Sequence, residues 1–174
     1  MQKSNIHTLK GPDRLGTMAL VGDKRWGDIR LKVRLRSEDD DAIGIVFRCQ
    51  DQDNYYRFSM DRERKYRRLI KRVDGKTTIL WEDKVIYVKG ASYDLTIEAY
   101  ADRILGWLDH VLLFDVKDSA LRRGQVGLYA WACEGAHFEA ISVEALESPV
   151  VLWKPALADL SDLQIVEESG AQDG

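Results

Sequence analysis

Hydrophobic and polar positions alternate strictly along several stretches of the chain. Between Ile29 and Arg36 every second residue is aliphatic, and each residue between two aliphatic ones is basic. Between Asp41 and Asp61 two alternating runs flank the polar turn 51–54. Successive side chains of a strand point to opposite faces, so a period of two predicts half-buried strands. Two such runs across a turn of Asp and Asn predict a β-hairpin, and the rest of the chain extends this pattern.

The alternation predicts a series of short strands and no helix before residue 150. The predicted strands lie near 18–21, 29–36, 42–50, 55–60, 66–73, 77–81, 93–100, 103–108, 111–114, 124–131 and 137–146. Asp74-Gly75 is a strong two-residue hairpin signal, because both positions of such a turn need positive φ. All three prolines lie outside the predicted strands, as a paired strand requires. The fold class predicted is all-β, a two-sheet antiparallel jelly-roll sandwich.

Strand parity also predicts which side chains form the core. The predicted core residues are Leu31, Val33, Ile43, Ile45, Phe47, Phe58, Leu95, Ile97, Leu108, Val126 and Leu128. Cys49 shares the parity of Ile45 and Phe47, so we expect it to point into the core as a small hydrophobic residue. A disulfide with Cys133 is left open, because the sequence does not show the distance between the two residues.

The chain divides into three segments. Residues 1–16 form an N-terminal arm, 17–148 the jelly-roll domain and 149–174 a C-terminal tail. The 174 residues are enough for one domain with a sizeable core. The tail contains an isolated Trp153 and leucines spaced by three, which predict a short helix or an extended docking segment. We expect Trp153 and Leu157 to be buried against the sandwich or a partner.

Charge and hydropathy limit the classes of partner. The net charge of −3 does not favour a nucleic-acid binder. The basic run 57–72, with Tyr56 and Tyr66, is split by alternation over both sheet faces, so we expect no nucleic-acid partner. No apolar run is long enough for a membrane span, and residues 1–10 do not resemble a signal peptide. We expect no membrane insertion, with a cytoplasmic location if Met1 is native and an extracellular one if the chain is an excised domain.

Several short runs occur in a specific order and spacing. They are Asp41–Arg48, Asp53–Ser59, Arg68–Leu69, Leu108–Phe114, Gly124–Tyr129 and Ala136–Glu139. This pattern, which extends from Trp26 to Val143, resembles the laminin-G-like and concanavalin A-like lectin/glucanase jelly rolls of large bacterial proteins. The resemblance implies two curved antiparallel sheets. Proteins of this kind include sugar binders, calcium-stabilised adhesion domains, hydrolases and spacers, so the fold does not fix the function.

The catalytic pattern of the related hydrolases is absent from the sequence. Those enzymes carry a Glu-x-Asp-x-x-Glu run on one strand face, whereas Glu139, Glu144 and Glu147 have a different spacing. Glycoside hydrolysis needs two carboxyl groups held roughly 5–10 Å apart, and no run here nominates such a pair. We therefore expect no enzymatic activity.

Three oxygen-rich turns leave calcium as an open alternative to ordinary solvated turns. They are Glu38–Asp41, Asp51–Asn54, and Asp23 together with Trp26–Asp28. None has the spacing of an EF-hand loop. Calcium is the cofactor that these turns could hold, and the sequence does not choose among them.

A candidate ligand site follows from side chains whose parity is opposite to that of the core. These are Arg48, Tyr55, Arg57, Trp107 and Trp131. Aromatic rings suit the apolar face of a sugar, and arginine offers a planar fork for carboxylates or vicinal hydroxyls. We expect a non-catalytic glycan-binding module, with an acidic glycan favoured. Two alternatives stay open: the two tryptophans seal the rim of the sandwich, or the domain is a structural module whose tail docks on a partner protein.

Overall fold

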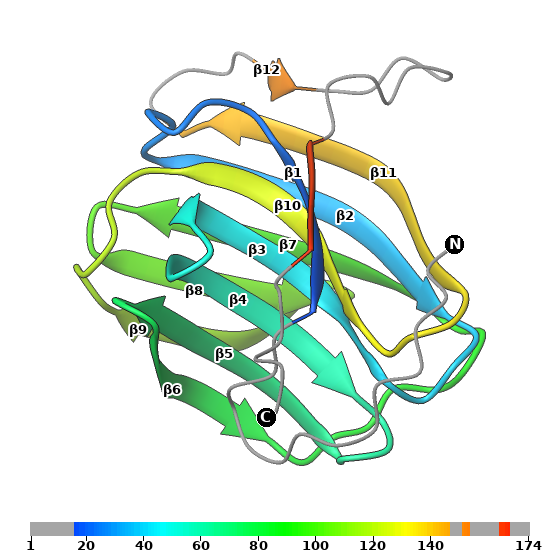
Figure 1. Cartoon of the computed structure of the whole chain (residues 1–174). Helices are drawn as coiled ribbons and strands as arrows, with labels where there is room; N and C mark the ends of the chain where they lie inside the picture. The colour runs from blue at the N-terminus through cyan, green and yellow to red at the C-terminus, as the bar shows by residue number, and fades with distance from the viewer. Residues whose placement is uncertain (1–15, 147–150, 154–163, 168–174) are drawn as a thin grey trace, which may run out of the picture.

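The computed structural model describes residues 16–146, 151–153 and 164–167, and these residues form two antiparallel sheets stacked face to face (Figure 1). Every element in this part of the chain is a strand, so the predicted all-β sandwich is confirmed. The same residues contain no helix that is long and apolar enough to cross a membrane.

The larger sheet, here called sheet A, has seven strands. Their order is β13 (Gln164–Glu167), β1 (Thr17–Val21), β10 (Gln125–Trp131), β3 (Ala42–Asp51), β4 (Asn54–Asp61), β5 (Tyr66–Val73) and β6 (Lys76–Asp83). The predicted hairpin at 42–60 is the β3–β4 pair near its middle. This position gives the hairpin one face toward the other sheet and one face outward.

The smaller sheet, sheet B, has six strands. Their order is β12 (Val151–Trp153), β11 (Ala136–Ala145), β2 (Ile29–Ser37), β7 (Ser92–Tyr100), β8 (Arg103–Leu108) and β9 (Val111–Lys117). Two segments of the predicted tail thus join the sheets as strands: β12 pairs with β11, and β13 pairs with β1. The side chain of Trp153 and the whole of Leu157 lie outside the described residues, so their predicted burial stays a prediction.

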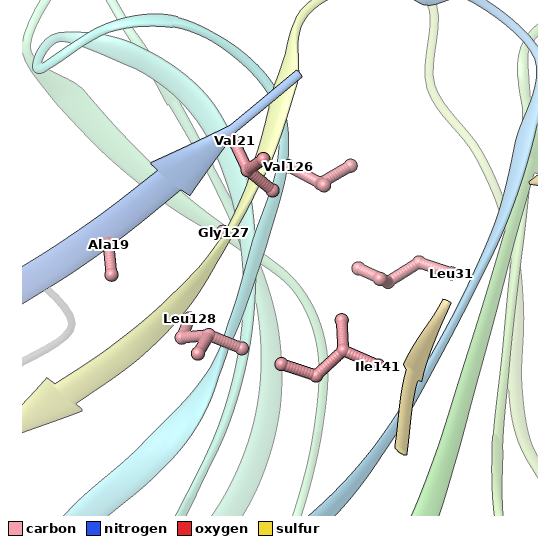
Figure 2. A pocket seen from close by; sticks show the side chains of 7 residues that line it. All are labelled: Ala19, Val21, Leu31, Val126, Gly127, Leu128 and Ile141. Atoms are coloured by element: carbon pink, nitrogen blue, oxygen red, sulfur yellow. The ribbon is translucent and has the colours of Figure 1, made fainter. Parts of the chain in front are cut away.

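The core lies between the sheets and contains every residue that parity predicted for it. All are buried except Leu128, which is partly buried and packs against the others. Each fully buried aliphatic side chain stabilises the fold by about 1.5–3 kcal/mol. A small apolar gap remains between β1 and β10 on one side and β2 and β11 on the other (Figure 2). Its volume of about 10 Å³ is close to the minimum that holds one water molecule, so it is not a ligand site.

The predicted two-residue turn forms at Asp74-Gly75, where φ is 48° and 74°. A second left-handed pair, Asp109-His110, joins β8 to β9 with φ values of 49° and 66°. Turns of this kind match the right-handed twist of the strands that they connect. They therefore fix the registers of the β5–β6 and β8–β9 hairpins.

A bulge in β3 corrects one prediction from parity. The β3–β4 register shifts between Phe47 and Asp51, and Arg48 has a φ of 48°. The extra residue inverts the alternation, so Cys49 packs with Val46 and Tyr55 on the outer face of sheet A. Its burial was predicted correctly, but its face was wrong. Cys49 and Cys133 are both buried thiols that are not joined to each other, so the disulfide that the sequence left open does not form.

Candidate functional site

The outer face of sheet A carries a continuous set of aromatic and arginine side chains. Strand registers align them in rows across the sheet: Tyr129, Gly44, Ser59 and Arg68 form one row, and Gly127, Val46, Arg57 and Ile70 form the next. We call the following set the arginine–aromatic layer: Tyr55, Arg57, Arg64, Tyr66, Arg68, Tyr129 and Trp131. Its members come from β10, β4, β5 and the turn between β4 and β5, so the long-range pairing of the sheet assembles it.

Three guanidinium groups of the layer stack on aromatic rings. Arg57 lies 4.4 Å from the centre of the Tyr129 ring, Arg64 lies 4.3 Å from that of Trp131, and Arg68 lies 3.6 Å from that of Tyr66. A planar guanidinium is weakly hydrated and attracted to the negative face of a ring, so it tolerates burial better than an ammonium group does. Each stack holds its arginine in one orientation, so the layer is preorganised.

Buried polar atoms that lack a hydrogen-bond partner among the described residues occur in the layer region. Ser59 Oγ and Arg68 Nε are such atoms, and their residues are cross-strand neighbours. Buried polar atoms nearly always have a hydrogen-bond partner. A bound ligand that hydrogen-bonds to Ser59 Oγ and Arg68 Nε would explain these two exceptions. Arg68 also forms a 2.6 Å ion pair with Glu82 of β6. The outer face is more exposed at β6, where Ile79 is 41% exposed.

A group of carboxylates borders the layer beside Trp131. Arg64, whose guanidinium covers that ring, contacts Asp41 and Glu63 at 2.6 Å and Asp61 at 3.4 Å. Burial and the neighbouring carboxylates, chiefly Glu63, raise the pKa of Asp41 to about 7. A change in the protonation of Asp41 therefore changes the net charge of the group of carboxylates around Arg64.

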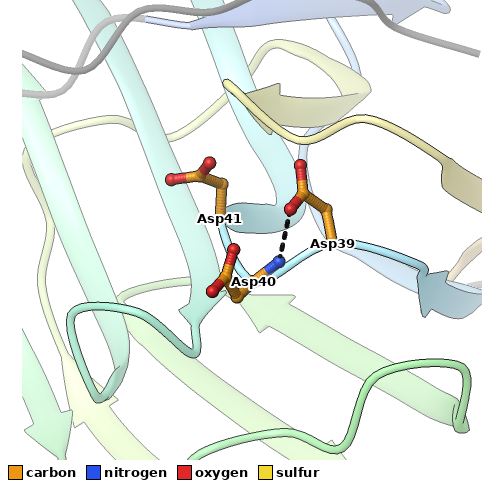
Figure 3. A group of neighbouring side chains, drawn as sticks. All are labelled: Asp39, Asp40 and Asp41. Atoms are coloured by element: carbon orange, nitrogen blue, oxygen red, sulfur yellow. Dashed lines mark hydrogen bonds between the residues drawn. The ribbon is translucent and has the colours of Figure 1, made fainter.

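The first of the three calcium candidates brings its carboxylates together. Ligand oxygens of Asp39, Asp40 and Asp41 lie within 4.8 Å of one another (Figure 3). Two of these side chains have protein partners: Asp41 pairs with Arg64, and Asp39 accepts hydrogen bonds from the backbone N–H groups of Asp40 and Glu134, both at 2.8 Å. The oxygen set fits the preference of Ca²⁺, but these partners compete with an ion for it.

The two other calcium candidates use their carboxylates in contacts with groups of the protein itself. Asp51 Oδ1 accepts hydrogen bonds from the Asp53 N–H at 2.8 Å and from the Asn54 side chain at 2.9 Å. Asp23 pairs with Arg25 at 2.6 Å. Asp28 Oδ1 accepts hydrogen bonds from Arg48 at 3.2 Å and from the Ala101 N–H at 2.7 Å. Within the described part of the chain, the Glu38–Asp41 turn is therefore the candidate whose oxygens converge.

The five residues nominated from the sequence do not form one site. Tyr55, Arg57 and Trp131 lie together on the outer face of sheet A, each only 1% exposed. Arg48 is also buried, but the bulge turns it toward the loops that close one end of the sandwich. Trp107 lies on sheet B, opposite Thr96 and Leu112, on the face that points away from the core.

Sequence reasoning left Ser59, Tyr66 and Arg68 out of the candidate site. The signal that could have found them is the register of the β4–β5 hairpin. Counting back across the turn 62–65 pairs Arg68 with Ser59, which has the same parity as the nominated Arg57. Tyr66 and Arg68 belong to the basic run 57–72, and that run is divided as predicted: Lys71 pairs with Asp118, away from the layer.

Comparisons with known proteins place the fold among carbohydrate-binding proteins. No family model matches the chain, and no curated protein matches it. Among solved structures, the carbohydrate-binding module CBM66 from Bacillus subtilis is similar, with a TM-score of 0.68 and 25% identity over 76% of this chain and 84% of that one. Galectin-Ib of Xenopus laevis has a TM-score of 0.58 and 16% identity over 74% and 99%. CG-16, a homodimeric agglutinin from chicken liver, has a TM-score of 0.57 and 12% identity over 74% of this chain and 99% of that one.

These likenesses confirm the jelly-roll, concanavalin A-like character of the sandwich. The galectin and agglutinin identities are low, so they bear on the fold alone. The arginine–aromatic layer lies on the outer face of sheet A, and the outer face of sheet B can be compared with it.

Proposed function

We propose that this protein is a non-catalytic carbohydrate-binding module, and that it holds an acidic glycan on the outer face of sheet A. The likeness to the carbohydrate-binding module of Bacillus subtilis, which extends over most of both chains, supports the class. The observation that carries the proposal is the arginine–aromatic layer. It combines flat rings with fixed positive charge on one face of a lectin-type sandwich.

The chemistry of the layer suits an acidic sugar in two ways. Its rings offer apolar platforms for the C–H face of a pyranose or furanose ring. Its guanidinium groups offer planar N–H pairs for a carboxylate. Ser59 Oγ and Arg68 Nε add two hydrogen-bonding atoms that have no partner among the described residues. A uronic acid presents a carboxylate and hydroxyls at the spacing of one sugar ring, so it matches this mixture.

Burial directs where the glycan makes contact first. Tyr55, Arg57 and Trp131 are almost fully buried, so a ligand that reaches them must replace contacts that bury them in the free protein. Toward β6 the face is more open, because the side chain of Glu82 is 20% exposed and Ile79 is 41% exposed. We therefore assign the first contact to Arg68 and its surroundings on β5 and β6.

A structural module that docks on a partner through its C-terminal tail is the alternative function. It fits less well, because two segments of that tail pair with strands of the chain's own sheets. A tail used in this way has less backbone left to offer a partner.

A glycan-array screen of the full chain, followed by titration of the best ligand, tests the proposal. Arg68→Ala is expected to weaken binding at least about tenfold, since a charge-assisted hydrogen bond is worth about 1.5–3 kcal/mol. Arg57→Ala and Trp131→Ala are expected to weaken it too. The matched control is Arg103→Ala, which removes an arginine from the outer face of sheet B and should leave binding unchanged. The absence of any glycan ligand, or equal losses in Arg68→Ala and Arg103→Ala, would reject the proposal.

A further inference from the structure

We propose a second binding site, for a doubly charged oxyanion such as inorganic sulfate or a phosphate group, at one end of the sandwich. An open hollow of about 540 Å³ lies there between the turn before β2 and the loop before β10. Three arginines, Arg25, Arg122 and Arg123, contribute to its lining, together with Gly27, Asp28, Ala101 and Ala145. We call this hollow the arginine pocket.

The floor of the arginine pocket rests on a buried arginine. Arg48 donates hydrogen bonds to the Ala101 carbonyl at 3.0 Å and to Asp28 Oδ1 at 3.2 Å. The same Asp28 oxygen accepts the Ala101 N–H at 2.7 Å. The carboxylate in the lining is therefore neutralised from inside, and it does not repel an anion as a free aspartate would. Arg48, which the sequence nominated for ligand contact, acts here as a positioning residue.

The loop that carries two of the wall arginines is firmly attached to the sandwich. Asp118, at its start, accepts hydrogen bonds from Tyr56 Oη at 2.6 Å and from Lys71 Nζ at 2.5 Å. In the middle of the loop, Leu121 donates its N–H to Tyr56 Oη at 3.2 Å, and its carbonyl accepts from Arg48 at 3.2 Å.

The end of that loop is held as well. The Gly124 N–H donates to the Trp26 carbonyl at 2.9 Å, and the Arg123 carbonyl accepts a hydrogen bond from the Gln50 side chain. A loop fixed at its start, middle and end loses little conformational entropy when its side chains bind a ligand. The backbone under Arg122 and Arg123 is thus preorganised.

The charges around the pocket favour an anion. Arg122 and Arg123 are exposed, and neither forms an ion pair with a described residue. Arg25 pairs with Asp23 in a contact that is largely open to solvent, with the Arg25 side chain 84% exposed, so this pair is weak. Guanidinium groups bind tetrahedral oxyanions through paired N–H donors, and several arginines around one hollow suit two negative charges better than one. A hollow of this size admits the group as part of a larger molecule.

Binding of inorganic sulfate and inorganic phosphate to the full chain tests this inference. The readout is the arginine Nε–H signals in nitrogen–proton NMR spectra, recorded at constant ionic strength. The wild type is expected to show saturable shifts, and Arg122→Ala/Arg123→Ala is expected to bind at least tenfold more weakly. The control is Lys32→Gln/Lys76→Gln, which removes the same charge from exposed positions elsewhere and should stay within twofold of the wild type.

The source of the oxyanion is distinguished with galactose 6-sulfate, glucose 6-phosphate and galacturonate. Glucose 6-phosphate, whose phosphate monoester is close to doubly charged at neutral pH, should bind more tightly than galactose 6-sulfate and galacturonate, which each carry a single charge. No saturable response to either inorganic anion, an equal loss in the control, or tighter binding of galacturonate would overturn the inference. Arg68→Ala should not affect these titrations, because that residue lies in the arginine–aromatic layer.

Discussion

The two outer faces of this sandwich use the same residue types for different purposes. On sheet A, Arg57 and Arg68 are buried and stack on tyrosine rings. On sheet B, Arg30 and Arg34 of β2 stand in solvent-exposed ladders with acidic residues of the neighbouring strands. Arg30 lies between Glu98 at 2.6 Å and Glu144 at 3.4 Å. In the sequence, the strands of both sheets show the same alternation of arginine with apolar residues.

What separates the faces is the aromatic ring on which the sheet A arginines stack. Sheet B sets a carboxylate opposite each of these arginines, so the charges neutralise one another in water. On sheet A each of the two arginines lies over a tyrosine ring, so its guanidinium group is held against apolar surface, and Arg68 pairs with Glu82 as well. Only sheet A sets stacked guanidinium groups beside flat rings, which is why we place the glycan site there. The following predictions test this contrast.

The largest expected difference is in the stability cost of losing one arginine. Arg57→Ala should lower the free energy of unfolding by about 3 kcal/mol, because it removes a buried stem and a desolvated stack on Tyr129. Arg34→Ala should cost less than about 1 kcal/mol, because its partner Asp94 is half exposed. Urea unfolding of both variants measures this. Equal losses would contradict the contrast.

The two faces should also respond oppositely to pH. The pKa of Asp41 is raised to about 7, above the value of about 3.9 for an unfolded chain. The folded state then holds an extra proton between these values, so this group lowers the free energy of unfolding as pH rises from about 4 to about 7. Relative to Asp41→Asn, the wild type should lose about 2 kcal/mol over this window in urea unfolding series.

Asp94 provides the matched control on sheet B. Its hydrogen bonds with Arg34 lower its pKa, so its contribution is present above the unfolded value and is lost only as pH falls below about 4. Asp94→Asn should therefore run parallel to the wild type between pH 5 and pH 8. A wild type that gains stability with pH relative to Asp41→Asn would refute the assignment for Asp41.

Substitution of the two tryptophans nominated from the sequence should also cost more stability on sheet A than on sheet B. Trp131→Phe removes part of a fully buried ring that is covered by Arg64, so a loss of about 1–2 kcal/mol is expected. Trp107→Phe changes a partly exposed ring on sheet B and should cost less than about 0.5 kcal/mol. Thermal unfolding compares them, and a larger loss at Trp107 would break the contrast.

The smallest expected effect is the coupling within the ladders of sheet B. A double-mutant cycle of Arg30→Met and Glu98→Gln should give about 0.5 kcal/mol at low salt and less at high salt. The corresponding cycle of Arg68→Met and Glu82→Gln should be larger and less sensitive to salt, because those side chains are only 10% and 20% exposed. An equal salt dependence of the two coupling energies would contradict this prediction, because it would show that Arg30 and Arg68 are equally screened by solvent.

The sequence predicted the sandwich well because period-two alternation and turn residues act locally. Every residue that parity assigned to the core lies in it, and Asp74-Gly75 formed the expected turn. Parity failed at Arg48, where one extra residue in β3 turned the side chain toward the loops at one end of the sandwich. No residue type near Arg48 requires a bulge, so the bulge left no sign in the sequence. The candidate site was found in part. Parity places a side chain on a face, but it does not say which strands meet, so Trp107 and Trp131 looked equivalent although they lie on different sheets.

The most direct test of the glycan site follows the indole N–H signals of Trp131 and Trp107 during a titration with the best glycan from the array. The two Phe variants above assign these signals in nitrogen–proton NMR spectra of the full chain. We predict a saturable shift of the Trp131 signal and no change at Trp107. A shift confined to Trp107, or saturable binding that leaves Trp131 unchanged, would contradict a site on the outer face of sheet A.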